Sequence, residues 1–314
     1  MKQTKKSTSH ISADYEAQLR KDYGTLIAKT IATDWRFANL SQQPGQAIAY
    51  VRLGAGKKQA TGRPVLFVPG FVGGIVANGA FGAAVASRGF DTLVPNQNRH
   101  GLLRNHRGLK DPTYTQAQNI MAIIASEGLE HVPLDIITHS YGGLILETMV
   151  REAERLGWTC FDSSRVVMLA PAGIKRPEWY PGFLYRYYQL RQFDRAALPE
   201  TKYYVFAGEM FTAGESFYKQ NRWRAIREGM AVMRRKIHIP YLLSHGIARI
   251  ELIAFPGDAL FGSNVLAKSF ARIHNKKVVA VNGYSLPTSD ASGHSDQQFD
   301  PQPIADVVAR FLQA

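Results

Sequence analysis

Residues 134–143 read Leu-Asp-Ile-Ile-Thr-His-Ser-Tyr-Gly-Gly, and a helical pattern follows them over residues 144–156. The apolar run that ends at Thr138 is typical of a buried strand, and a tight turn connects it to that helix. The turn presents the hydroxyl of Ser140 at its apex. A serine hydroxyl is a weak nucleophile that must stand clear of its backbone to meet a substrate and a base. The pattern is compatible with a nucleophile or with a structural turn, and Thr138 departs from the plain Gly-x-Ser-x-Gly form.

The composition is that of a soluble globular protein, with 314 residues, 45% of them hydrophobic and 20% charged. This length suits one large domain or one domain with an insertion. The single cysteine, Cys160, excludes an internal disulfide and is expected to be small and buried rather than nucleophilic. The basic start is followed by polar residues, and no apolar run reaches the roughly 18 residues that span a bilayer. We therefore expect a cytoplasmic protein. We expect neither a cofactor nor a metal.

The net charge of +13 favours anionic partners, which include acidic lipid, nucleic acid and an anionic substrate. Nucleic acid is the weakest of these, because no recognisable binding module is present. Residues 175–236 hold thirteen Lys and Arg against six Asp and Glu, which is over half of the net charge. Within them, residues 222–235 could steer an anionic substrate, contact acidic lipid or be a solvated surface. The basic loop 98–108 could bind a carboxylate or phosphate group.

Strand and helix patterns alternate along most of the chain. A basic tail over residues 1–10 precedes an amphipathic helix over 12–33, which is expected to pack on the body rather than attach to a membrane. Strands are predicted at 47–53, 64–68, 90–94, 134–138, 166–169, 249–255 and 277–281, and helices at 81–87, 113–126, 144–156, 265–273 and 303–312. Continuous apolar strands that alternate with helices predict an α/β fold with a mostly parallel central sheet and helices on both faces. Ligands bind such sheets at the carboxyl ends of the strands.

The alternation stops after Gly173, and about 70 residues rich in aromatic and basic side chains follow. We interpret residues 174–246 as an inserted helical lid. Residues 46–173 and 247–314 then form the core, and residues 1–45 form the N-terminal tail and helix. The lid's aromatic side chains could offer an apolar surface over a pocket or form the lid's own core.

Three segments that follow strands carry further chemistry. The glycine-rich run 69–74 comes directly after a strand, and it lacks the Gly-Lys-Ser/Thr ending of a phosphate-binding loop. We expect the backbone N–H groups of Phe71 and Tyr141 to stabilise an oxyanion. Asp258 follows the strand 249–255, where it could orient an imidazole or simply belong to a turn. His294 follows the last predicted strand and is the candidate base.

Other residues compete for these roles. Asp290 and Asp296 lie in the loop of His294, where capping or solvation explains them better. His139 adjoins Ser140, and its side chain is expected to point away from it. His100 and His106 lie in the basic loop.

The order Ser140, Asp258, His294, with each residue after a different strand, resembles the α/β-hydrolase superfamily over residues 45–170 and 246–313. The landmark segments are 63–71, 138–143, 256–261 and 293–294. Pro69 departs from the pattern, since a histidine often precedes the oxyanion glycine. The resemblance implies that His294 deprotonates Ser140, which attacks an ester carbonyl while the two N–H groups hold the oxyanion.

The expected function is a serine hydrolase of the esterase or lipase type that acts on a small, apolar acyl substrate. The alternative is a catalytically silent member of the fold that binds a lipid surface or a partner through its basic lid. The oligomeric state stays open.

Overall fold

The computed structural model describes residues 35–40, 47–54, 62–70, 75–96, 111–174, 182, 229–255, 258 and 301–314. These residues form an α/β fold around a seven-stranded sheet with the strand order β1-β2-β4-β3-β5-β6-β7. The strands are β1 (Trp35–Asn39), β2 (Ala47–Leu53), β3 (Val65–Val68), β4 (Thr92–Pro95), β5 (Asp135–His139), β6 (Ser164–Leu169) and β7 (Ile247–Ile253). Strands β3 to β7 pair in parallel, whereas β2 is antiparallel to both β1 and β4. The predicted fold class, with its mostly parallel central sheet, is confirmed.

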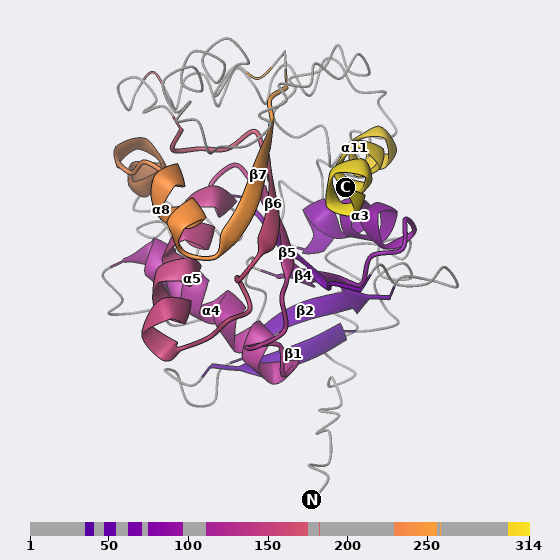
Figure 1. The fold of residues 1–314 in the computed structure, drawn as a ribbon, viewed down its shortest axis with the longest axis horizontal. Helices are drawn as coiled ribbons and strands as arrows, with labels where there is room; N and C mark the ends of the chain where they lie inside the picture. Colours follow the sequence, from indigo (N-terminus) through magenta and orange to yellow (C-terminus); the bar gives the residue numbers. More distant parts are fainter. Residues whose placement is uncertain are drawn as a thin grey trace, which may run out of the picture.

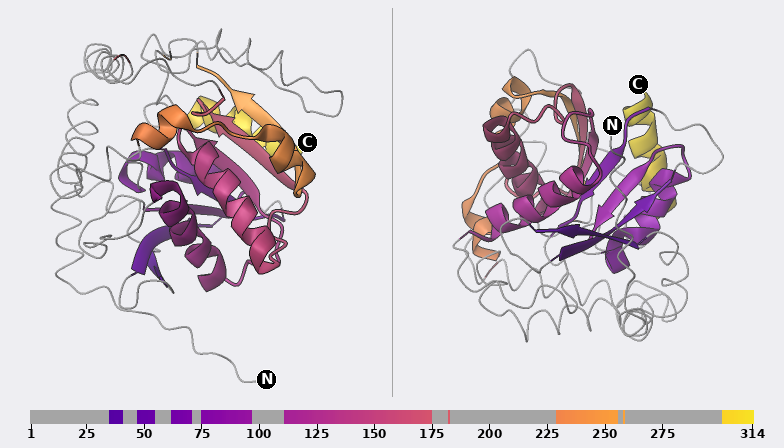
Figure 2. Two further views of the ribbon diagram at one scale, coloured as in Figure 1. Left: turned by 90° about the vertical axis from the view of Figure 1, so that its left-hand side faces the viewer. Right: turned by 90° about the horizontal axis from the view of Figure 1, so that it is seen from below.

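Helices cover both faces of this sheet (Figures 1 and 2). They are α3 (Ile75–Ala86), α4 (Pro112–Ser126), α5 (Gly142–Leu156), α8 (Ile239–Ser244) and α11 (Pro301–Gln313). Helices α3 and α11 lie together on one face, and α4, α5 and α8 lie on the other. Along β5, Ile136 belongs to the core beneath α4 and α5, while Ile137 belongs to the core beneath α3 and α11. A strand covered on both faces buries both of its faces, which explains the two consecutive apolar residues in β5.

Local sequence fixes the ends of α4 and α5. Asp111 caps α4, because its side chain accepts hydrogen bonds from the N–H groups of Thr113 and Tyr114, and Pro112 takes the first helical position. Gly157 ends α5 in the left-handed conformation, with φ at 71°. The start of α4 and the end of α5 are therefore set by residues at those positions.

The segment that leads into β7 packs against the same core as α5. Residues 229–234 are helical, and α8 follows them after a short connection. Val232, Ile237 and Leu242 are buried in the core cluster on this face of the sheet. The Ile237 N–H donates to the carbonyl of Gly173 at 3.0 Å, which joins this segment to the chain just beyond β6.

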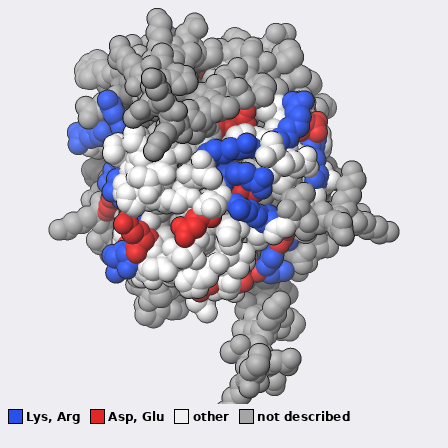
Figure 3. Space-filling model, viewed as in Figure 1, with Lys and Arg blue, Asp and Glu red and all other residues white. Residues whose placement is uncertain are grey.

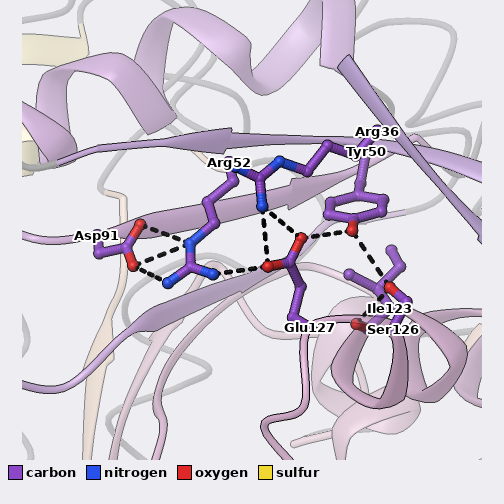
Figure 4. Close-up of polar contacts among 7 residues, drawn as sticks. All are labelled: Arg36, Tyr50, Arg52, Asp91, Ile123, Ser126 and Glu127. Carbon is purple, nitrogen blue, oxygen red and sulfur yellow. Dashed lines mark hydrogen bonds and ion pairs between the residues drawn. The ribbon is translucent and has the colours of Figure 1, made fainter. Parts of the chain in front are cut away.

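The edge strand β1 is an element that the sequence pattern did not predict. A polar network holds it to the body (Figure 4). Arg36 of β1 donates to both carboxylate oxygens of Glu127 at 2.8 and 2.9 Å, and Arg52 of β2 donates to one of them at 2.6 Å. Tyr50 donates its hydroxyl to the same carboxylate at 2.5 Å. Glu127 is the C-cap residue of α4, so the network ties two antiparallel strands to the end of a helix.

Ionisation of this network follows from its contacts. Burial opposes a charge on Glu127, but hydrogen bonds from Tyr50, Arg36 and Arg52 outweigh it, and the pKa of the carboxyl lies below its ordinary value. Burial and the bond to Glu127 raise the pKa of Tyr50 to about 12. At neutral pH the carboxylate is therefore charged and the phenol is neutral.

Positive and negative side chains are balanced in the described part of the chain. It contains twelve Lys and Arg and twelve Asp and Glu, and both signs are visible on the face drawn in Figure 3. The whole chain has 38 and 25, so twenty-six basic and thirteen acidic residues lie outside the described ranges. The entire net charge of +13 comes from those other segments.

Candidate active site

Ser140 lies in a tight turn between β5, which ends at His139, and α5, which begins at Gly142. Its φ is 50°, which is a strained conformation for a residue other than glycine. Backbone hydrogen bonds hold it on both sides. Its N–H donates to Leu169 at 2.9 Å, and its carbonyl accepts from Ala172 at 3.0 Å. This is the strand-to-helix turn that the sequence predicts, and it forms although Thr138 replaces the usual small residue.

Strand β3 and helix α5 approach each other closely at Gly142. A Cβ at Gly142 would lie 2.2 Å from the carbonyl oxygen of Val68, at the end of β3. Thr138 is fully buried within the sheet, and its Oγ1 has no hydrogen-bond partner within the described ranges. The contact between β3 and α5 therefore depends on Gly142. The β-branched side chain of Thr138 fits within the sheet.

The glycine-rich run after β3 begins directly against Ser140. A Cβ at Gly70 would lie 3.0 Å from the Cβ of Ser140 and 2.9 Å from Nδ1 of His139. Just beyond the run, the N–H of Ile75 at the start of α3 donates to Oδ1 of Asn96 at 3.4 Å. The start of the run is thus next to the serine, and the helix that follows the run is attached to the residue after β4. Phe71, the expected oxyanion donor, lies outside the described residues.

Tyr141, the second expected oxyanion donor, directly follows Ser140 and is fully buried. Its hydroxyl and the Oγ1 of Thr113 are 2.5 Å apart. Thr113 is also fully buried and belongs to the first turn of α4. The turn that carries Ser140 is therefore attached through a side chain to a second helix.

Asp258 lies beyond β7 at the same edge of the sheet. The ends of β5, β6 and β7 are aligned, since Ser140 N–H bonds to Leu169 and Ala170 N–H bonds to Ile253 at 2.8 Å. Asp258 is only 4% exposed, and its N–H donates to the carbonyl of Phe255 at 3.1 Å. The structure thus places Ser140, Tyr141 and Asp258 at the carboxyl edge. His294 and its competitors Asp290, Asp296, His100 and His106 lie outside the described residues.

Cys160 is fully buried, and burial raises the pKa of its thiol to about 12. The nucleophilic thiolate is therefore scarce at neutral pH, as expected from the sequence. Among the described residues, no group of three or more His, Cys, Asp or Glu is arranged to hold a metal ion. The same residues contain no helix that is both long enough and apolar enough to cross a bilayer.

Two site residues escaped the sequence reasoning. Thr113 follows an Asp-Pro pair, which signals a helix start but gives no sign of a partner 28 positions away. Asn96 could have been recognised from the sequence, because a polar residue directly after a buried strand is a common feature of this sheet edge. Its attachment to the start of α3 is a tertiary contact that no local pattern encodes.

No protein-family model and no curated protein matches the sequence. Solved structures do resemble it. A membrane phospholipase A is 14% identical, with a TM-score of 0.64 over 95% of this chain and 91% of the other. A serine hydrolase from Cycloclasticus zankles is 12% identical, with a TM-score of 0.60 over 89% and 97%. An esterase from Rhodococcus is 16% identical, with a TM-score of 0.59 over 90% and 99%.

At these identities the likeness is one of fold. For the phospholipase and the Rhodococcus esterase it covers at least 90% of each chain. The chain therefore has the α/β-hydrolase fold.

Proposed function

We propose that this protein is a serine hydrolase that cleaves an ester or related acyl bond of an apolar small molecule. The observation that carries the proposal is the geometry of Ser140, which sits at φ 50° between β5 and α5 with Gly70 against its Cβ. A strained serine at the carboxyl edge of a parallel sheet, beside a glycine-rich backbone, is what a nucleophile next to an oxyanion site requires. The hydrolytic enzymes that share this fold support the proposal.

In the proposed mechanism His294 removes the proton from the hydroxyl of Ser140, which attacks the acyl carbonyl carbon. Asp258 orients the imidazole and stabilises its positive charge. The N–H groups of Tyr141 and Phe71 bind the oxyanion, and the protonated His294 gives its proton to the leaving alcohol. Water, deprotonated by the same imidazole, then attacks the acyl-enzyme and releases the acid.

The substrate class rests on the segment that precedes β7. Residues 174–246 are rich in aromatic side chains, which suit an apolar acyl group. The described end of this segment packs on the core beside α5, through Val232 and Ile237. We propose that the segment is a lid over the acyl pocket. We also propose that any contact with anionic lipid is made by basic residues outside the described part of the chain, in which positive and negative charges balance.

Labelling with a fluorophosphonate probe tests the nucleophile. The wild type should be labelled, and Ser140→Ala should lose the label. Ser87→Ala should keep it, because the Ser87 hydroxyl lies at the end of α3, where it donates to Ala84 and accepts from Arg88. A heat-sensitive label that persists in Ser140→Ala would exclude Ser140. A chain-length series of p-nitrophenyl esters should then give turnover that depends on Ser140. Absence of labelling and turnover, with sedimentation on anionic vesicles, would favour a silent lipid-binding member of the fold.

A further inference from the structure

The strained backbone of Ser140 has to be held in place by its surroundings. A residue other than glycine at positive φ is strained, and this conformation persists only where neighbouring structure enforces it. The backbone bonds of Ser140 to Leu169 and Ala172 act on its own peptide groups. The next residue, Tyr141, shares a peptide group with Ser140, and its side chain is fully buried.

Tyr141 is attached at the far end of its side chain. Its hydroxyl lies 2.5 Å from Oγ1 of Thr113, and both residues are fully buried. Because both hydroxyls are buried, bulk water does not compete for the hydrogen bond between them. The bond spans from the turn before α5 to the first turn of α4.

The Thr113 end of this bond is itself fixed. Asp111 accepts hydrogen bonds from the N–H of Thr113 at 2.9 Å and of Tyr114 at 3.4 Å. Asp111 also pairs with Arg235, which belongs to the segment that leads into β7. Thr113 is thus held by the N-cap of its own helix, and that cap is held by a second part of the chain.

We propose that the Thr113–Tyr141 hydroxyl pair is a positioning device for the nucleophile turn. This inference rests on the proposed hydrolase function. The pair fixes the ring of Tyr141, which fixes the Ser140–Tyr141 peptide and so aims both the Ser140 hydroxyl and the Tyr141 N–H. Neither side-chain hydroxyl contacts the substrate. Loss of the pair lets the turn relax, and a displacement on the order of 1 Å at a reacting group can lower the rate about 100-fold.

A purely structural role for the pair makes a different prediction. In that case its removal lowers the melting temperature and leaves the turnover of the folded enzyme unchanged. The chain offers a matched control in Tyr50, whose hydroxyl donates to Glu127 at 2.5 Å beside β1. Tyr50→Phe removes a tyrosine hydroxyl bond of similar length that lies outside the candidate site.

The test compares Thr113→Val, Tyr141→Phe, their double variant, Thr113→Ser and Tyr50→Phe. For each, kcat and KM on the best ester, the rate of fluorophosphonate labelling and Tm are measured. Thr113→Val and Tyr141→Phe should each lower kcat and the labelling rate about 10- to 100-fold, with KM within about twofold. The double variant should be no slower than the slower single variant, because all three lack the same bond. Thr113→Ser should stay near the wild type.

Three results would overturn the positioning role: kcat values unchanged in both single variants, losses that multiply in the double variant, or an equal fall in kcat for Tyr50→Phe. A wild type that is neither labelled nor active would instead overturn the proposed function, and the positioning role with it. A labelled wild type with unaffected variants removes the positioning role alone.

Discussion

Gly142 offers the sharpest test of how β3 and α5 meet at the candidate site. A Cβ at this position would lie 2.2 Å from the carbonyl oxygen of Val68 and 3.1 Å from that of Pro69. Both obstacles are backbone atoms of β3 and the residue after it, so no side-chain rotation can relieve them. Gly142→Ala must therefore push the start of α5 away from the sheet.

Overpacking of this kind costs about 1–3 kcal/mol, and the backbone location of the clash puts Gly142→Ala at the upper end. The better helix propensity of alanine returns about 1 kcal/mol at most, since the site is in the first turn. A net loss of about 2 kcal/mol corresponds to a fall in Tm of roughly 3 °C for a chain of 314 residues. The labelling rate of Ser140 should fall as well, because its turn moves with the helix.

The adjacent Gly143 is the matched control. A Cβ there would lie 2.5 Å from Cδ1 of Ile237, which is the end of a flexible side chain and can rotate away. Gly143→Ala should therefore change the free energy of unfolding by less than about 1 kcal/mol. Thermal and urea denaturation followed by circular dichroism would measure both variants. Equal Tm values for Gly142→Ala and Gly143→Ala would refute the close approach of β3 to α5.

Three further predictions concern the body of the fold. The Cys160 thiol should resist iodoacetamide at pH 8 and react once urea unfolds the chain, since its pKa is raised to about 12; fast alkylation of the native protein would contradict its burial. Asp135→Ala should lower the free energy of unfolding in urea by about 3 kcal/mol, because it leaves the partly buried Arg165 without its carboxylate; a change under about 1 kcal/mol would show that the pair contributes little. Glu127→Gln should destabilise at pH 7, and its difference from the wild type should shrink as pH falls through the carboxyl's lowered pKa, since the charged form is the one that the fold stabilises; a constant difference down to pH 3 would contradict this.

The parallel part of the sheet could be predicted because burial on both faces requires apolar runs, which are visible in the sequence. Strand β3 is wholly apolar, and β5 and β6 each contain an apolar run; all three strands form within two residues of the predicted positions. The start of α3 was harder to predict. The helix begins at Ile75, six residues before the predicted start, and it contains Gly79 and Gly82. Interior glycines weaken the helical signal, and packing between the sheet and α11 compensates for it.

Strand β1 shows where local pattern fails. Its sequence Trp-Arg-Phe-Ala-Asn has no long apolar run, and Arg36 finds its partner Glu127 at a separation of 91 residues. At the candidate site, the turn at Ser140 was readable from adjacent residues, because strand, serine and glycines follow one another. The bond from Thr113 to Tyr141 was not, since it depends on how two helices lie against one sheet.

The ion pair between Arg36 and Glu127 also determines the alignment of β1. Arg36 pairs opposite Tyr50, which puts both side chains on the α4 side of the sheet, where the carboxylate of Glu127 is only 7% exposed. A shift of β1 by one residue would turn Arg36 to the opposite face and leave that carboxylate with one guanidinium fewer. Strands at the edge of a sheet are prone to such slippage and to pairing with foreign chains. A polar network that tolerates a single alignment thus fixes the edge strand of the described sheet, together with the buried Ala38 of the same strand.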